Sequence, residues 1–311
     1  MNLNYFQRYW TTIFVYLVLA ILVVVASMLS EVFPTSRNFN NILIQAIPIA
    51  FVSFGQTFVI LTEGIDLSMG AVVSLTTCLT TGMILGRESL VVPVVALVIV
   101  LALFIGFCNG FLITRIGVSP LVTTLGMMGL IEGVALIYTN VPYGAVPESF
   151  YFIAWGKMGF IPFPVFLMGM AAVVGIIILK RTRFGRYVYA TGGDEEIARL
   201  SGIKTHRVKI ISYMICSFTA GLTGIFLASR MGMGDPLIGE RYMLDSIVPV
   251  LIGGTSLSGG KGGLGGTIPG VFILAILANV LNLLGVSGWW NWIVEGIIII
   301  IAVAFYWKEK E

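Results

Sequence analysis

Most of this 311-residue chain consists of apolar runs about as long as a lipid bilayer is thick, separated by short polar segments. A helix that crosses the hydrocarbon core needs about 20 mostly apolar residues. Because only helices and closed barrels satisfy the backbone inside lipid, the runs predict an all-α polytopic membrane protein with about ten transmembrane helices. The predicted spans lie near 11–29, 43–62, 67–86, 91–113, 120–140, 163–180, 209–229, 245–257, 266–285 and 290–307.

Hydrophobic residues make up 58% of the chain and charged residues 11%, which excludes an ordinary soluble domain. We therefore expect residues 1–311 to form a single transmembrane domain. The net charge of +3 comes from basic residues in membrane-flanking loops and does not suggest nucleic-acid binding. The first apolar run lacks a clear cleavage site, so we expect it to be retained as a span.

The basic residues predict the orientation, because Lys and Arg accumulate on the cytoplasmic side of a membrane. An even number of spans places both termini on one side, and 13 of the 18 Lys and Arg residues fall on that side. They are Arg8, Arg115, Lys180, Arg181, Arg183, Arg186, Arg199, Lys204, Arg207, Lys209, Lys261, Lys308 and Lys310. Both termini are therefore expected in the cytoplasm.

Several spans are interrupted, and the segment Gly253–Gly266 is unusually dense in glycine. It is not a phosphate-binding P-loop, because Thr255 stands where the motif needs glycine and Gly262 stands where it needs Ser or Thr. We expect a glycine-rich cytoplasmic turn that interrupts a span. Broken or re-entrant helices of this kind are where transporters place their permeation paths.

One sizeable polar segment, 181–208, separates two apolar runs and carries much of the basic charge. Its middle predicts a helix of about seven residues, in which Asp194 is the N-cap, Glu195 lies in the first turn and Gly202 ends the helix. A helix this short persists only by docking. Its weakly apolar face consists of Ile197, Ala198, Leu200 and Ser201. It docks either on its own membrane domain or in a groove of a cytoplasmic partner.

Two segments on the opposite side, 141–162 and 230–244, are expected to be ordered extracellular loops or short surface helices. They are candidates for docking a soluble binding protein or for a lid over the bundle. Three G-x-x-x-G pairs, at Gly106–Gly110, Gly129–Gly133 and Gly266–Gly270, predict close helix contacts. One of these faces is a candidate for dimerisation.

Few ionisable residues fall within the predicted spans, namely Glu132, Asp245 and Glu295. Each should face the bundle interior or a cavity. Asp66, just before the third span, is expected to cap that helix at its start near Leu67, with a role as gate or substrate contact as the alternative. The candidates for the translocation path are Asp66, Asn109, Thr123, Thr124 and Asn279, each of which could instead hold helices together.

A path lined by amides and hydroxyls suits a neutral, hydroxyl-rich solute. The single histidine, His206, lies outside the predicted spans, and the acidic residues are scattered, so a proton relay is not evident. Neither a catalytic constellation nor a metal-ligand spacing is evident, and we expect no enzymatic activity. Two further functions stay open: an ATP-independent carrier or channel, and an enzyme that acts on lipid-linked sugars.

Four blocks together resemble a known family. They are Leu61–Gly70, Ser119–Met128, Arg181–Ile203 and Leu244–Gly266. Their order and spacing are similar to those of the membrane subunits of bacterial ABC importers for ribose, xylose, galactose, galactofuranose and autoinducer-2. This chain departs from the family pattern at Glu63, where glycine is usual, at Ser119, where proline is frequent, and at Asp194 and Ile197, which replace Asn and Ala.

The resemblance implies a permease in the bacterial inner membrane that imports a sugar. A separate ABC ATPase subunit would bind ATP, so the permease needs no cofactor of its own. A periplasmic or lipid-anchored binding protein would deliver the sugar, and a second permease would complete the pore as a homodimer or heterodimer. The residues implied in ATPase coupling are Phe184, Gly185, Asp194, Glu195, Ile197, Ala198, Leu200, Ser201 and Gly202.

Overall fold

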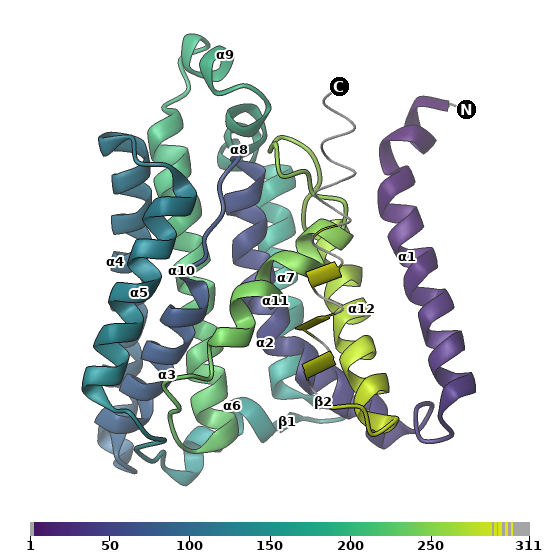
Figure 1. Ribbon diagram of the computed structural model, residues 1–311, viewed down its shortest axis with the longest axis vertical. Coiled ribbons are helices and arrows are strands. Elements are labelled where there is room, and N and C mark those ends of the chain that lie inside the picture. Colours follow the sequence, from purple (N-terminus) through teal and green to yellow (C-terminus); the bar gives the residue numbers. More distant parts are fainter. Residues whose placement is uncertain (1–2, 288, 291, 294–295, 298–299, 301–311) are drawn as a thin grey trace.

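The computed structural model describes residues 3–300, apart from 288, 291, 294–295 and 298–299, and shows a bundle of helices (Figure 1). Nine helices coincide with the first nine predicted spans, while the tenth, 290–307, lies largely outside the described residues. The nine are α1 (Leu3–Leu29), α2 (Ser36–Leu61), α3 (Met69–Ile84), α4 (Val91–Phe111), α5 (Pro120–Tyr138), α7 (Phe163–Arg181), α10 (Thr205–Met231), α11 (Glu240–Ile252) and α12 (Leu264–Leu283).

Within the described part of the chain, seven of these helices are long and apolar enough to cross a membrane. The helices α3 and α11, with 16 and 13 residues, are shorter than a full span. The all-α polytopic architecture is confirmed. Within the described residues seven helices therefore qualify as candidate membrane spans, and the ten spans and their orientation stay predictions.

The shorter elements gather at the two ends of the bundle (Figure 1). One end, here called the α9 end, carries the π-helical turn η2 (Leu112–Ile116), α8 (Arg183–Gly193), α9 (Glu195–Leu200) and the loop 253–263. The other, the hairpin end, carries η1 (Glu88–Leu90), η3 (Glu148–Tyr151), α6 (Phe152–Trp155), and the antiparallel strands β1 (Lys157–Met158) and β2 (Ile161–Pro162).

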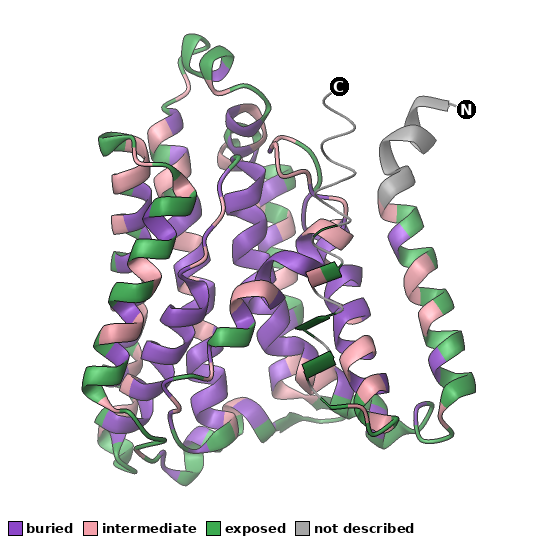
Figure 2. Cartoon of the chain, viewed as in Figure 1, coloured by how far each residue is buried: buried purple, intermediate pink, exposed green. Residues whose placement is uncertain are grey.

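The helices divide into central and peripheral ones (Figure 2). Most residues of α2, α3 and α10 are buried, including hydroxyl and amide side chains such as Gln56 and Thr76. Helices α1, α4, α5 and α7 expose large apolar side chains on their outer faces, among them Val24, Phe104 and Ile137. In a bilayer such faces are covered by lipid or by another subunit, so their exposure is compatible with a stable fold.

The two short helices start inside the bundle. The segment 62–68 leaves the end of α2 at the α9 end and runs extended back into the bundle before α3 begins (Figure 1). The segment 232–239 leaves the end of α10 at the hairpin end and runs along α3. A Cβ added at Gly234 would lie 2.6 Å from Cys78 Cα, and one at Gly239 would lie 1.8 Å from the Gly70 carbonyl oxygen.

Residues 232–239, part of the predicted extracellular segment 230–244, thus pack along α3, although Met233 and Leu237 stay exposed. Their polar groups are satisfied inside the protein: Gly234 exchanges backbone hydrogen bonds with Tyr143, and the Gly239 N–H donates to Ser74 Oγ at 2.9 Å. Such non-helical backbone is tolerated at membrane depth only where protein or a water-filled cavity satisfies it. Extended backbone therefore lies on both sides of the Gly70–Gly239 crossing, and the segments 62–68 and 232–239 are here called the re-entrant segments. The glycine-rich segment 253–266, which was expected to interrupt a span, forms the loop between α11 and α12 and the first turn of α12.

The three G-x-x-x-G pairs have different environments. Gly106 and Gly110 pack on α10, where added Cβ atoms would lie 2.4 Å from the Tyr213 carbonyl oxygen and 2.6 Å from Ile210 Cα. Gly266 and Gly270 similarly hold α12 against α11. Gly129 and Gly133 have no described atom within 4 Å of an added Cβ. Close packing is thus confirmed for two pairs, and the third lies on an uncovered face of α5.

The crossing predicts a steric effect that can be measured. Gly239 has an ordinary φ of −79°, so Gly239→Ala strains the protein only through its clash with the Gly70 carbonyl. We expect overpacking to cost about 1–3 kcal/mol and to lower the thermal midpoint by about 2–10 °C in detergent or nanodiscs. Gly169→Ala on α7, where an added Cβ meets nothing within 4 Å, is the control. Equal midpoints for the two variants would contradict the crossing.

Candidate functional site

Helix α8 is anchored to the membrane helices that precede it. Thr182 caps its start, because Thr182 Oγ1 accepts a hydrogen bond from the Gly185 N–H at 3.1 Å. Phe184 stacks on Phe58 of α2, with ring centroids 6.4 Å apart. Gly185 is buried so closely that a Cβ would lie 2.2 Å from the Leu179 carbonyl oxygen. Phe184 and Gly185, both predicted to act in coupling, thus fix α8 on its own domain.

The predicted caps of α9 are confirmed. Asp194 has an extended conformation, and its Oδ1 accepts a hydrogen bond from the Ile197 N–H at 2.8 Å. At the other end Gly202 has a φ of +84°, which an L side chain adopts only at a cost, and Ile203 N–H donates to the Ala198 carbonyl at 3.1 Å. The helix of six residues is therefore specified at both ends by local sequence.

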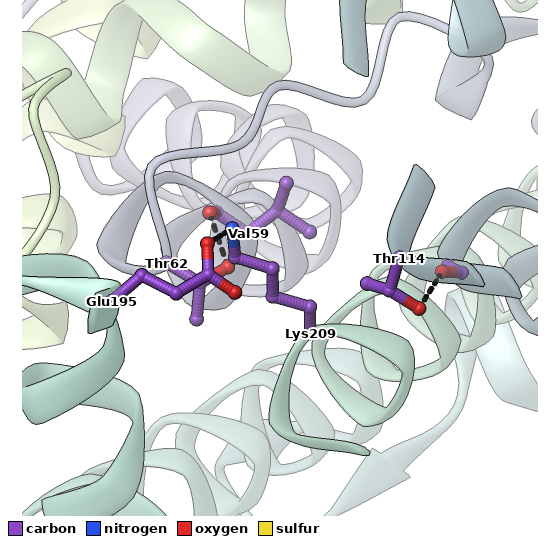
Figure 3. Close-up of polar contacts among 6 residues, drawn as sticks. Val59, Thr62, Thr114, Glu195 and Lys209 are labelled. Atoms are coloured by element: carbon purple, nitrogen blue, oxygen red, sulfur yellow. Dashed lines mark hydrogen bonds and ion pairs between the residues drawn. The ribbon is translucent and has the colours of Figure 1, made fainter. Parts of the chain in front are cut away.

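The two faces of α9 have different roles in packing. Ala198 is buried within the chain, and Glu195 forms an ion pair with Lys209 of α10 (Figure 3). Ile197 and Leu200 point outward, with 62% and 77% of their surfaces exposed. The helix docks on its own domain with one face, as one of the two alternatives predicted, and presents two apolar side chains with the other; docking on a cytoplasmic partner stays a prediction.

Two polar groups near this segment have shifted pKa values. A hydrogen bond from Arg199 to Glu196 at 2.7 Å, together with the charge of Glu196, raises the pKa of the exposed Arg199 guanidinium, which stays charged. Burial raises the pKa of the Tyr189 phenol in α8, so it stays protonated and donates to the Gly262 carbonyl at 2.9 Å. Arg199 is therefore an exposed, paired cation beside the apolar residues of α9, and Tyr189 ties α8 to the loop 253–263.

A polar cavity of about 380 Å³ lies beside α9. Its walls come from the π-helical turn η2, from α9 and from the start of α10. Thr114 in this wall donates to the Gly110 carbonyl at 2.7 Å, and Figure 3 shows it beside the Glu195–Lys209 pair. The lining residues are Ile113, Thr114, Arg115, Glu195, Arg199, Thr205, His206 and Lys209. The cavity adds basic charge to the α9 end.

Asp66 and Asn109, predicted for the path, meet inside the bundle. Asp66 Oδ1 accepts hydrogen bonds from Ser68 N–H at 2.9 Å and from Ser68 Oγ at 2.6 Å. Ser68 Oγ in turn accepts from Asn109 Nδ2 at 2.9 Å. Ser68 is the N-cap of α3, which begins at Met69, so the prediction that Asp66 caps the helix directly was wrong. Asp66 instead closes a turn that orders the extended segment before the helix.

Thr124 joins the same region from α5. Its hydroxyl lies 3.4 Å from the Ile65 carbonyl, to which Tyr213 of α10 also donates at 3.3 Å. Thr123 is buried, and its hydroxyl has no hydrogen-bond partner within the described chain. Asp66 Oδ2 and Asn109 Oδ1 likewise have no hydrogen-bond partner within the described chain. The segment 65–68 is thus the centre of a buried polar cluster with spare hydrogen-bonding capacity.

Asn279 lies elsewhere and does not join this cluster. Its side-chain amide and that of Asn38 exchange two hydrogen bonds, at 3.0 and 2.9 Å, between α12 and α2. Both residues are buried. A reciprocal amide pair of this kind holds two helices together, which favours the structural alternative for Asn279.

The sequence placed Glu240 and Arg241 in the extracellular segment 230–244 and Glu132 within a span. Glu240 and Arg241 open α11 beside the Gly70–Gly239 crossing, deep in the bundle, and both are exposed. Arg241 pairs with Asp245 at 3.2 Å. Charges at this depth avoid lipid. The one available signal was the loss of apolar character after Met231.

A multi-helix membrane domain with two broken helices and a buried polar cluster at their junction defines a membrane transport protein. The profile of the family described as branched-chain amino acid transport system/permease component matches residues 38–303. The chain belongs to this family, and it is a multi-pass protein of the bacterial inner membrane.

Several curated relatives align over nearly their whole length. The ribose import permease RbsC of Bacillus subtilis is 42% identical over 300 residues, covering 95% of this chain and 92% of the relative. RbsC of Escherichia coli K12 is 40% identical, covering 92% and 90%. The D-allose permease AlsC of the same strain is 33% identical, covering 96% and 92%. No solved structure gives a significant match to the chain.

The cap of α9 predicts a local effect on helix stability. In Asp194→Ala the Ile197 N–H loses its acceptor, which costs about 0.5–2 kcal/mol and should speed amide exchange in 197–201 about 2- to 30-fold. Asp194→Asn keeps an acceptor oxygen and should exchange at nearly the original rate. Hydrogen–deuterium exchange with mass spectrometry gives the comparison, with peptides from α12 as internal reference. Unchanged exchange in the alanine variant would show that the cap does not stabilise α9.

Proposed function

We propose that this chain is the membrane permease subunit of an ATP-driven importer for a monosaccharide or a related small neutral polyol. The observation that carries the proposal is its full-length similarity to permeases named for ribose, D-allose and L-arabinose. ATP is bound and hydrolysed by a separate subunit, and the segment 181–208 couples the two through α9.

The distribution of charge supports a cytoplasmic location for the α9 end. Arg37, Arg87, Lys157 and Arg230 are the basic residues at the hairpin end. Those at the α9 end are Arg115, Lys180, Arg181, Arg183, Arg186, Arg199, Lys204, Arg207, Lys209 and Lys261. By the positive-inside rule, this distribution favours a cytoplasmic α9 end and a hairpin end on the opposite side of the membrane.

The buried cluster supports a sugar over an amino acid, although the family description names branched-chain amino acids. Amides and hydroxyls around 65–68 can exchange hydrogen bonds with sugar hydroxyls, and Thr123 and Asn109 have unused capacity. An amino acid would bring an ammonium and a carboxylate, and its carboxylate would need a positive partner. The described residues that surround Asp66 include no Lys or Arg.

The uncovered surfaces support the expected partners. Gly129 and Gly133 leave an open strip on α5 along which a second permease can pack closely. At the hairpin end, η3, α6 and the β1–β2 hairpin offer an exposed surface for a sugar-binding protein. Import then requires that ATP and the loaded binding protein each favour one of two bundle conformations.

Uptake measurements test the function. Cells expressing this chain with its candidate ATPase and binding protein would be given labelled ribose, allose and arabinose. A parallel strain would carry an ATPase unable to hydrolyse ATP. We expect uptake of at least one sugar only with the active ATPase, and uptake that survives collapse of the proton gradient while ATP is maintained. Equal uptake in both strains would identify a carrier or channel.

Coupling through α9 predicts the effect of changing its outer face. The double variant Ile197→Asp, Leu200→Asp changes two exposed side chains, so the protein should still fold. Binding would bury two carboxylates against an apolar groove of the ATPase, which should weaken ATPase binding at least about 100-fold. Co-purification and uptake measure the loss. Val141→Asp, at a residue 58% exposed at the opposite end, is the matched control. Wild-type ATPase binding by the double variant would contradict coupling through this face.

A further inference from the structure

Three backbone segments meet closely at the α9 end. Gly192 is the next-to-last residue of α8, Leu61 ends α2, and Gly259 and Gly260 lie in the loop between α11 and α12. The Gly260 N–H donates to the Leu61 carbonyl at 3.0 Å. We call Gly192, Leu61, Gly259 and Gly260 the glycine clasp. Two residues after Leu61, the backbone nitrogen of Glu63 also lies beside Gly259.

The three glycine positions of the clasp leave no room for a side chain. A Cβ at Gly192 would lie 1.8 Å from the Leu61 carbonyl oxygen and 2.7 Å from the Gly260 nitrogen. A Cβ at Gly259 would lie 2.7 Å from the Gly192 carbonyl oxygen. Gly259 and Gly260 also have φ values of +72° and +68°, which L side chains rarely adopt. The close spacing therefore requires glycine at 192 and 259, and the positive φ values require it at 259 and 260.

Hydrogen bonds extend the clasp into the neighbouring elements. Tyr189 of α8 donates to the Gly262 carbonyl at 2.9 Å. The Gly263 N–H donates to Thr255 Oγ1 at 3.0 Å, and the Thr255 N–H donates to the Val250 carbonyl near the end of α11 at 3.1 Å. The loop is thereby tied to α8 on one side and to α11 on the other.

These connections link α9 to both broken helices. Gly193 and Asp194 join the clasp to α9 directly. From Leu61 the chain continues into the extended segment 62–68, which carries the Asp66 cluster and leads to α3. From Thr255 the path runs along α11 to the crossing of Gly239 and Gly70. Because packed backbone contacts do not deform continuously, a displacement of α9 must move both segments or break the clasp.

We propose that the glycine clasp transmits the movement of α9 to both re-entrant segments, with α8, the end of α2 and the α11–α12 loop moving as one unit. The inference rests on the proposed function, since it concerns the step between ATP hydrolysis and opening of the path. It assigns Gly192, Gly260 and Tyr189 as positioning residues that touch neither the ATPase nor the sugar.

Neighbouring glycines provide a matched test. Gly192→Ala forces the clasp apart, whereas an added Cβ at Gly193 meets nothing within 4 Å. The full complex of permease, ATPase and binding protein would be reconstituted in liposomes, and sugar transported per ATP hydrolysed would be measured. We expect Gly193→Ala to match the original protein. We expect Gly192→Ala to assemble and hydrolyse ATP with sugar uptake per ATP lowered at least tenfold.

A gentler variant covers the case in which Gly192→Ala does not assemble. Tyr189→Phe removes one hydroxyl and its bond to Gly262 without a clash, and it should lower uptake per ATP several-fold with ATPase binding unchanged. If the Gly192→Ala complex assembles, sugar uptake per ATP equal to that of the original protein overturns the proposal. If it does not assemble, the same result in Tyr189→Phe overturns it. Absence of ATP-dependent uptake by the unaltered complex would instead refute the proposed function.

Discussion

The contact on which the fold depends is the crossing of two backbones at Gly70 and Gly239 inside the helical bundle. Two extended segments enter from opposite ends and stop there, and a short helix begins from each. Inside a bilayer such backbone survives only if neighbouring helices satisfy its polar groups. This requirement explains why the hydroxyl-rich helix α3 is so thoroughly buried, with Ser74 and Thr81 bonded to the segments beside it.

Sequence was sufficient wherever structure depends on local pattern. Nine helices lie where the apolar runs predict them, and Asp194 and Gly202 bound α9 as their chemistry requires. Positions decided by distant parts of the chain were harder. Asn279 bonds Asn38, 241 residues away, and 232–239 lies along α3 because of glycines at both places. G-x-x-x-G spacing also failed to separate Gly106–Gly110, which is packed, from Gly129–Gly133, which is open.

In the candidate site, too, local sequence predicts some features while contacts with distant parts of the chain decide others. Coupling residues assigned by resemblance have three different positions: Phe184 and Gly185 hold α8 on its domain, Ala198 holds α9, and Ile197 and Leu200 face outward. A motif records which residue types occur together and cannot record which way each one points. Ile197 and Leu200 are the apolar members of an exposed set that also includes Asp194, Ser201 and Gly202. The substitution of Ile for Ala at position 197 therefore falls on an exposed face of α9.

The backbone at Glu63, between the end of α2 and the extended segment that leads to α3, is strained. It has a φ of +62° at a position where glycine is usual in the family it resembles, and the left-handed region costs a non-glycine residue about 1–2 kcal/mol. The Glu63 N–H donates to the Ile60 carbonyl at 3.0 Å, and Gly259 packs on the same nitrogen. Strain of this kind persists only where the surroundings over-determine the backbone. The clasp supplies that constraint at the residue where α2 ends and the re-entrant segment begins, so a movement transmitted through the clasp acts directly on the most strained turn before Asp66.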